Sequence, residues 1–348
     1  MTNLIFRSKA PLRISFAGGG TDISPYPELY EGAVISSTID MYSYTSINLI
    51  NKKLIRIHSR DFEISKEIKK DDDLKGKDQL RLVYAILKNL KTKAKKGIEI
   101  TLFTDAKVGS GLGASSSLAV ALIGNLLRVF KIHKTQYEIA DLAYKIERLD
   151  CGIKGGYQDQ YSATFGGLNF IEFKKNGVVV NPLRLRKNVL DEMLANLILC
   201  DTKVKRKDEI YEKIIQAQSS KAKRNDYQTQ NLHNIKKTTY EMKDSLLKGN
   251  LDEFAELLHL GWLEKQKIDP DISTKKINKL YQIARKAGAK GGKLLGAGGG
   301  GYMLLYCDMD KKLDVIKALE KQNTTITKFN FDKSGLTTWM VNNGIVSR

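Results

Sequence analysis

The feature that most constrains this chain of 348 residues is a glycine- and serine-rich segment at residues 107–117. Apolar residues at 97–103 predict a strand before it, and the apolar residues after it predict a helix that ends near residue 130. Glycines allow backbone N–H groups to face a ligand. A helix that begins in such a loop adds its own unpaired N–H groups and the positive end of its dipole. We therefore predict an anion site here, with phosphate as its ligand.

Two familiar phosphate-binding loops do not account for this segment. A Walker A loop ends in Gly-Lys-Ser or Gly-Lys-Thr, and no such lysine follows these glycines. Gly109, Gly111 and Gly113 have the spacing of a dinucleotide fingerprint, but that fold requires a second strand that ends in an acidic residue. The chain continues instead with Thr135 and Glu138, which form the capping box of another helix. Tight packing alone would leave the three consecutive serines at the helix start without a role.

Two further glycine-rich segments flank the first. Three glycines precede Asp22 at the end of an expected strand at 13–16. The Asp22 carboxylate is suited to accept hydrogen bonds from sugar hydroxyls, or simply to close a turn. Four glycines at 298–301 stand before an expected strand that ends at Cys307. Consecutive glycines cost backbone entropy, which favours a close approach to a ligand or to another backbone.

Taken together and in this order, the three segments resemble the GHMP kinase superfamily of galacto-, homoserine, mevalonate and phosphomevalonate kinases. The matching motifs are Pro-x-Arg at 11–13, leading to Thr-Asp at 21–22, then Gly-x-Gly-Leu-Gly-x-Ser-Ser at 109–116 and Gly-Ala-Gly-Gly-Gly-Gly at 296–301. The variants AGGGTD and GYQDQYSATFGGLNF are most similar to the branch that acts on D-glycero-D-manno-heptose 7-phosphate, with the fucokinase-like sugar kinases as neighbours.

The resemblance implies transfer of phosphate from ATP, with Mg²⁺, to the anomeric hydroxyl of that heptose phosphate, giving the 1,7-bisphosphate for nucleotide-activated heptose synthesis. It implies Asp159 as the catalytic base, Arg13 beside it, and Glu147 with Ser115 as magnesium ligands, since Ala114 stands where other members have a first serine. The implied ATP-binding residues are Val108, Gly109, Ser110, Gly111, Leu112, Gly113, Ala114, Ser115 and Ser116, and the implied substrate-binding residues are Gly18, Gly19, Gly20, Thr21, Asp22, Gly298 and Gly299.

Physical reasoning supports some of these roles and leaves alternatives open. Glu147 lies near the end of an expected helix, where a carboxylate opposes the helix dipole and gains from a bound cation. Lys145 or Arg148 could supply that positive charge instead. Asp159 is either the base or an aspartate that caps a helix.

The net charge of +19 favours a phosphorylated small-molecule substrate. Nucleic-acid binding is not expected, because the lysines are scattered in twos and threes without dense basic runs, interleaved aromatics or zinc-finger spacing. Arg7, Lys9 and Lys154 lie in or beside the motifs and are candidates for holding the phosphate of the acceptor. Each would otherwise be an ordinary surface cation.

The resemblance implies an α+β fold in two domains. Residues 1–185 would form an ATP-binding domain with a mixed sheet, and residues 186–348 a ferredoxin-like domain, with ATP and acceptor in the cleft between them. The longest apolar stretch, at 118–127, is shorter than the roughly 20 residues that span a bilayer, so no membrane association is expected. Three widely spaced cysteines fit a reducing cytoplasm, where we expect the protein to act. The oligomeric state stays open, a homodimer included.

Two other classes of function remain open. One is a kinase for another acceptor, of the mevalonate or fucose type. The other is a non-catalytic module for sugar sensing or nucleic-acid binding that keeps the same fold. The presence of Arg13, Ser115, Glu147 and Asp159 together favours an active enzyme, because a degraded site should have lost at least one of them.

Overall fold

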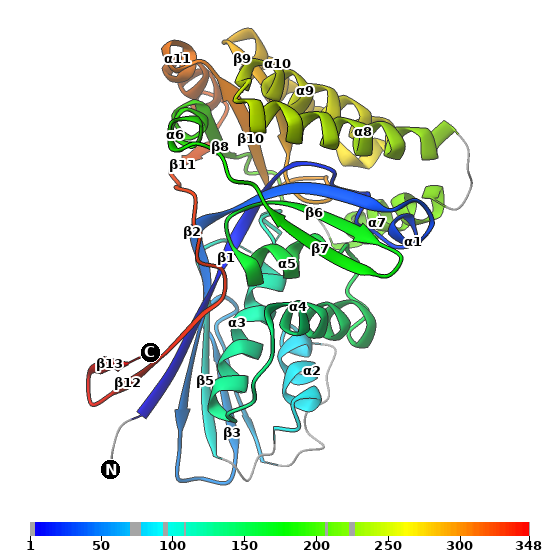
Figure 1. Ribbon diagram of the computed structural model, residues 1–348. Coiled ribbons are helices and arrows are strands. Elements are labelled where there is room, and N and C mark those ends of the chain that lie inside the picture. The colour runs from blue at the N-terminus through cyan, green and yellow to red at the C-terminus, as the bar shows by residue number, and fades with distance from the viewer. Residues whose placement is uncertain are drawn as a thin grey trace.

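The computed structural model describes residues 4–69, 78–92, 97–107, 109–205, 208–222 and 227–347. Within them the chain forms a sheet of nine strands and a sheet of four, each accompanied by helices (Figure 1). The strands of the larger sheet are β1 (Leu4–Ala17), β2 (Gly32–Leu49), β3 (Ile55–Ser59), β4 (Ile64–Ile68), β5 (Ile98–Thr104), β6 (Leu168–Lys174), β7 (Gly177–Pro182), β12 (Thr337–Asn342) and β13 (Ile345–Ser347).

The larger sheet is mixed, as predicted. Its strands run in the order β13-β12-β1-β2-β5-β3-β4, while β6 pairs with β2 and β7. Strand β3 is parallel to β5, and the other strand pairs are antiparallel. The long strand β2 pairs with β1 on one side. On the other side it pairs first with β6 and then with β5, so one strand serves both parts of the sheet.

Helices from the amino-terminal half pack beside this sheet (Figure 1). Helix α3 is buried along most of its length, because β1 and β2 cover one side of it while α2, α4 and α5 cover others. The predicted capping box begins α4, with Thr135 and Glu138 each accepting a hydrogen bond from the backbone of the other. The helical elements here are α1 (Tyr26–Tyr30), α2 (Arg81–Asn89), α3 (Ala114–Val129), α4 (Gln136–Tyr144), the π-helix η3 (Lys145–Asp150) and α5 (Gln158–Phe165).

The smaller sheet has the strand order β11-β8-β10-β9, and all neighbouring strands are antiparallel. Helices connect β8 to β9 and β10 to β11, which gives the βαββαβ order of the ferredoxin-like fold and confirms that prediction. Its elements are β8 (Leu197–Asp201), α7 (Asp208–Ala222), α8 (Tyr227–Lys248), α9 (Leu251–Ile268), the 3₁₀ turn η4 (Pro270–Ile272), α10 (Lys275–Lys286), β9 (Ala289–Leu294), β10 (Tyr302–Cys307), α11 (Met309–Glu320) and β11 (Thr325–Thr327).

Helix α6 (Lys187–Asn196) corrects one expectation about local structure. The apolar residues at 194–200 predict a strand, but the strand begins only at Leu197, because the preceding residues are helical. Val189 and Met193 are buried four residues apart, which is the spacing of a helix that packs one face on the core.

The two sheets are joined by an apolar core. Ile14 and Phe16 of β1 belong to the same buried cluster as Met242 of α8 and Phe254 of α9. The rings of Phe16 and Phe254 meet edge to face with their centroids 5.4 Å apart. Such aromatic pairs add stability beyond the area that they bury. Strand β1 is therefore held from both halves, which fixes the position of the side chains at its end.

The carboxy-terminal hairpin returns to the larger sheet. Strand β12 pairs with β1 and with β13, so the last strands lie beside the first one (Figure 1). The predicted domain boundary at 185/186 stays a prediction. Residues 337–342 and 345–347, although far beyond it in sequence, form strands of the larger sheet. Among the described residues, no helix is long and apolar enough to cross a membrane.

Candidate active site

A cavity of about 640 Å³ lies where the two halves meet. Its lining includes the end of β1 and the loop after it, the glycine loop before α3, the segment from η3 to α5, and helices α7 and α9. Residues at 59–62, 78–83, 102–106 and 296–297 complete the described lining. This volume is within the range of small-molecule sites, which often form at domain interfaces.

The glycine loop presents the start of α3 to the cavity. Gly109, Gly111 and Gly113 all have positive φ, between 77° and 81°. Gly113 is the residue before the helix and has a left-handed conformation, and the first N–H groups of α3 follow it. This is the geometry of an anion site at a helix N-terminus. The predicted residues that line the cavity are Gly109, Ser110, Gly111, Gly113, Ala114, Ser115 and Ser116.

Leu112 does not belong to the described lining of the cavity. Leu112 is fully buried, and its carbonyl accepts a hydrogen bond from the Arg13 N–H at 3.0 Å. This bond ties the loop to β1. Val108 lies outside the described residues.

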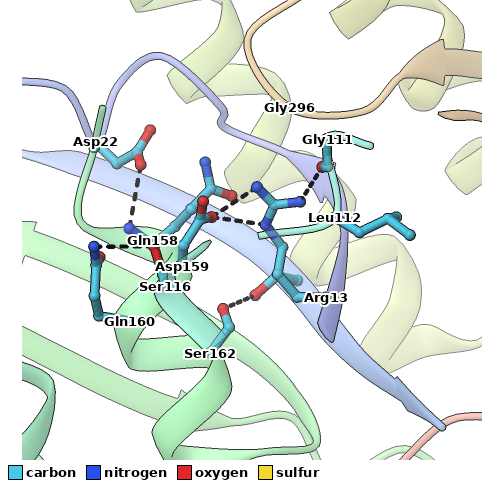
Figure 2. A network of polar contacts seen from close by, with 12 residues as sticks. Arg13, Asp22, Gly111, Leu112, Ser116, Gln158, Asp159, Gln160, Ser162 and Gly296 are labelled. Carbon is cyan, nitrogen blue, oxygen red and sulfur yellow. Dashed lines mark hydrogen bonds and ion pairs between the residues drawn. The ribbon is translucent and has the colours of Figure 1, made fainter. Parts of the chain in front are cut away.

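Arg13 and Asp159, from β1 and the first turn of α5, form an ion pair beside the loop (Figure 2). Asp159 Oδ1 accepts from Arg13 Nε at 2.8 Å and lies 2.7 Å from Arg13 Nη2, while Arg13 Nη1 donates to the Gly111 carbonyl at 2.5 Å. A Cβ atom at Gly113 would lie 3.4 Å from Asp159 Cγ and 3.5 Å from Arg13 Cγ. These are ordinary van der Waals distances, so the phosphate loop lies directly beside the pair, and the positive φ of Gly113 is what favours glycine there.

Glu147 is almost completely buried, with 1% of its side chain exposed, in the π-helix η3. Its Oε2 accepts from the Ser116 hydroxyl and from the Gln160 amide, both at 2.6 Å, and its Oε1 lies 3.3 Å from an Arg148 nitrogen. The hydroxyl beside Glu147 is therefore that of Ser116, whereas the predicted ligand Ser115 is exposed at the cavity surface.

Asp22 closes the other side of the cavity. Its side chain is 1% exposed, and its two carboxylate oxygens accept hydrogen bonds from the Gly20 and Gln158 N–H groups at 3.0 and 3.2 Å. Burial raises the pKa of Asp22 above its ordinary value, and the nearby charge of Asp159 raises it further, while the backbone hydrogen bonds act in the opposite direction.

The predicted substrate glycines divide into two groups. Gly19 and Gly20 line the cavity with Asp22. Gly18 and Thr21 instead build the loop: a Cβ at Gly18 would meet the Ala33 carbonyl at 1.9 Å, and the Thr21 hydroxyl donates to the Gly18 carbonyl.

Gly298 and Gly299 pack against η4 and are absent from the described lining of the cavity. A Cβ at Gly298 would lie 2.8 Å from the Ile272 Cα, and the Gly299 N–H donates to the Ile272 carbonyl. Close approach to another backbone explains Gly298, and a positive φ of 79° explains Gly299, so the position of neither supports the predicted contact with substrate.

Two buried lysines near the cavity were missed by the sequence reasoning. Lys265 of α9 is 4% exposed and donates to the Gly296 carbonyl at 2.7 Å. Lys293 of β9 is 5% exposed and donates to the Phe16 carbonyl at 3.3 Å. Burial holds the pKa of Lys293 well below its ordinary value, and the charges of Lys265 and Arg13 lower it further.

A sequence signal for Lys265 existed. It stands three residues from both Trp262 and Ile268, which are buried, so it lies on the apolar stripe of α9. A charged residue on such a stripe is seldom fully buried without a special environment.

The three candidates for holding an acceptor phosphate differ in their position relative to the cavity. Among them, Lys154 lines the cavity. Arg7 is exposed on β1, and the Lys9 ammonium lies 3.9 Å from the centre of the Tyr42 ring. Arg7 and Lys9 do not belong to the described lining of the cavity.

Comparisons with known proteins agree with this arrangement. Residues 81–167 match the model for the GHMP kinases N terminal domain, and residues 242–324 match the model for the GHMP kinases C terminal domain. The D-glycero-alpha-D-manno-heptose 7-phosphate kinase of Campylobacter jejuni is 36% identical over 340 residues, which cover 96% of this chain and 99% of the relative.

Two solved structures share the whole fold. One is described as a D-glycero-D-manno-heptose 1-phosphate kinase from Bacteriodes thetaiotaomicron, with 32% identity, a TM-score of 0.79, and coverage of 96% of this chain and 98% of the other. A putative sugar kinase from Campylobacter jejuni has 34% identity, a TM-score of 0.78, and coverage of 97% and 98%. With both family domains present and a relative of this identity along nearly its whole length, the chain belongs to the GHMP kinase family and is a phosphotransferase that uses ATP.

Proposed function

We propose that this kinase transfers the γ-phosphate of ATP to the anomeric hydroxyl of D-glycero-D-manno-heptose 7-phosphate, giving the 1,7-bisphosphate. The observation that carries the chemistry is the Arg13–Asp159 pair directly beside the phosphate loop. The choice of acceptor rests on the full-length similarity to a relative of that name. Lys154 lines the cavity and is the candidate for holding the 7-phosphate.

The residues present suit in-line phosphoryl transfer, which depends on positioning and charge stabilisation more than on covalent catalysis. The acceptor O1 forms a bond to the γ-phosphorus, and the bond from that phosphorus to the β–γ bridging oxygen breaks, so ADP leaves with the electron pair. The proton of the O1 hydroxyl passes to the Asp159 carboxylate. Arg13 holds that carboxylate in place and balances its charge before the proton arrives.

Glu147 and Ser116 fit a magnesium ion. They place a carboxylate oxygen and a hydroxyl oxygen 2.6 Å apart at the start of α3, next to the phosphate loop. Magnesium prefers oxygen ligands and usually completes its shell with phosphate oxygens and water. No cluster of three or more His, Cys, Asp or Glu side chains suited to a metal occurs among the described residues, so the nucleotide would supply the other ligands. When bound, the ion would offset the charge of the phosphates.

The Glu147→Gln variant tests this assignment. We expect the Mg²⁺ concentration that half-saturates ATP binding to rise about 10- to 100-fold, as when a group that supports a metal is lost. Binding of a fluorescent ATP analogue over a Mg²⁺ titration measures this without turnover. Glu212→Gln, a change at another carboxylate of the lining, is the control and should leave the titration unchanged. An unchanged Mg²⁺ requirement in Glu147→Gln would contradict the assignment.

A panel of acceptors tests the proposed reaction. ADP release would be measured with heptose 7-phosphate, heptose 1-phosphate, unphosphorylated heptose, fucose and mevalonate, and ³¹P NMR would locate the new phosphate. We expect turnover with heptose 7-phosphate and a new phosphate on O1. Heptose 1-phosphate is the rival acceptor, because the similar Bacteriodes protein is described as a heptose 1-phosphate kinase. Turnover with that compound alone, or with fucose or mevalonate in preference, would overturn the proposed acceptor.

A further inference from the structure

Gln218 of α7 is the polar side chain that protein contacts explain least. It is 2% exposed, and neither its amide oxygen nor its amide nitrogen has a hydrogen-bond partner among the described residues. Leaving buried polar groups unpaired is costly, so native structures rarely contain a fully unsatisfied amide without a reason.

Gln218 belongs to the wall of the cavity. Tyr211, Ile215 and Gln218 all line it, and their spacing of four and three residues places them on one face of α7. The helix is fixed against the loop before α1, since the Ser219 hydroxyl donates to the Ser24 carbonyl at 2.7 Å. Gln218 is therefore held at the cavity by its backbone, not by contacts of its own amide.

The neighbour of Gln218 across the cavity wall is Gly20. A Cβ atom there would lie 3.4 Å from Gln218 Oε1, and the Gly20 N–H donates to Asp22 Oδ1. Gly20 thus stands between the amide of Gln218 and the carboxyl group of Asp22.

Other polar groups converge on the adjacent glycine. A Cβ at Gly19 would lie 3.5 Å from Lys265 Nζ, 3.8 Å from Gln158 Nε2 and 3.9 Å from Ser15 Oγ. The Ser15 hydroxyl and the Gln158 amide oxygen are also buried without a partner among the described residues. Several unsatisfied groups from different elements thus surround one glycine pair, which is the pattern of a site that a polar ligand completes.

We propose that Gln218 binds hydroxyl groups of the acceptor and makes the enzyme selective for a polyhydroxylated substrate. A neutral amide offers one acceptor and two donor positions, which match a pair of neighbouring hydroxyls that can each donate and accept. An anionic group would be held better by a cation, so the phosphate of the acceptor belongs elsewhere in the cavity. This inference rests on the proposed function and adds the residue that would read the sugar.

The Gln218→Met variant tests the proposal, because methionine has a similar length and shape without the amide. We expect KM for heptose 7-phosphate to rise about 10- to 100-fold, since hydroxyls of the bound sugar would lose their partner. KM for ATP should change less than about twofold. The melting temperature should stay the same or rise, because the buried amide has no partner to lose in the free protein. Gln216→Met, on the exposed face of the same helix, is the matched control and should change none of these values.

Monodeoxy analogues of heptose 7-phosphate sharpen the test. The wild-type enzyme should discriminate against the analogue that lacks the hydroxyl bound by Gln218, and Gln218→Met should lose most of that discrimination. A folded Gln218→Met enzyme with KM for the sugar within twofold of wild type would overturn the proposal. A fall in melting temperature with unchanged KM would assign Gln218 a structural role and also overturn it.

A further variant covers the case in which Gln218→Met does not fold. Gln218→Asn keeps the amide but withdraws it by one methylene, and we expect it to fold and to raise KM for the sugar. An unchanged KM there would contradict the proposal. If the wild-type enzyme phosphorylates no acceptor of the panel, the proposed function fails instead. Calorimetric binding of heptose 7-phosphate to wild type and to Gln218→Met then still decides the role of Gln218.

Discussion

Two pairs of oppositely charged residues lie in or near the cavity, and the contacts that compensate their buried charges differ. Arg13 and Asp159 are in direct contact, with Arg13 Nη2 2.7 Å from Asp159 Oδ1. Asp22 and Lys293 are as deeply buried as Arg13, but neither forms an ion pair within the described part of the chain. Backbone N–H groups hold Asp22, and the Phe16 carbonyl accepts from Lys293.

The difference shows two ways in which a protein can bury charge. Direct pairing compensates each charge of the Arg13–Asp159 pair with its partner. Without such contact, burial disfavours the charged form, and the pKa of Asp22 is raised while the pKa of Lys293 is lowered. We infer that the first pair serves the chemical step and that the second contributes to stability in a way that depends on pH.

The largest effect is expected when the paired acid is neutralised. Asp159→Asn keeps an oxygen that can accept from Arg13 but removes the base, so kcat should fall about 10²- to 10⁴-fold. ADP release measures kcat, and a melting curve confirms that the variant is folded. Asp310→Asn, at an exposed aspartate of α11, is the control. Near-normal turnover in Asp159→Asn would mean that another group accepts the proton.

A change at Arg13 tests whether the geometry of its contact with Asp159 matters beyond its charge. Arg13→Lys keeps the positive charge, but an ammonium cannot reproduce the fork that reaches both Asp159 and the Gly111 carbonyl. We expect kcat to fall about 10- to 100-fold, which is less than in Asp159→Asn. Steady-state kinetics at saturating ATP measure this, with Arg128→Lys on α3 as the control. Wild-type kcat in Arg13→Lys would show that charge alone is enough.

Local patterns made much of this molecule predictable. The glycine loop, the helix after it and the capping box at Thr135 depend on neighbouring residues, and all three occur as predicted. The ferredoxin-like strand order followed from the resemblance carried by the three ordered motifs. The sequence also placed Arg13 and Asp159 together through that resemblance, although 146 residues separate them.

The remaining features depend on packing between distant segments. The π-helix η3 sets where Glu147 points, and this places the hydroxyl of Ser116, not that of Ser115, beside it. The glycines at 298–301 look like a ligand loop in sequence, yet Gly298 packs closely on η4 and Gly299 donates a backbone hydrogen bond to it. Gln218 carries no motif, and its unsatisfied amide becomes visible only once the cavity is formed.

A smaller effect, on thermal stability, is expected from Asp22, the buried acid without an ion-pair partner among the described residues. Because the folded-state pKa of Asp22 is raised, its contribution to stability is fully present below the unfolded value of 3.8 and is lost as pH rises through the folded pKa. The wild-type melting temperature should therefore fall relative to that of Asp22→Asn as pH rises from about 4 into the neutral range, by roughly 1–3 °C. Scanning calorimetry of both proteins across this range measures the difference. A constant difference, or one of opposite slope, would contradict a raised pKa.

Lys293 provides the mirror image of that experiment. Its lowered folded-state pKa makes its contribution to stability present above the unfolded value of 10.5 and lost as pH falls through the folded pKa. Lys293→Met replaces the amine with an apolar group of similar length, so at neutral pH or below its melting temperature should exceed that of wild type by about 2 °C. The gain should shrink as pH rises toward 10. Lys286→Met, at an exposed lysine of α10, is the control that should show no such trend. A gain that is the same at every pH would mean that the Lys293 amine keeps one charge state throughout, and the contrast with the Arg13–Asp159 pair would then rest on Asp22 alone.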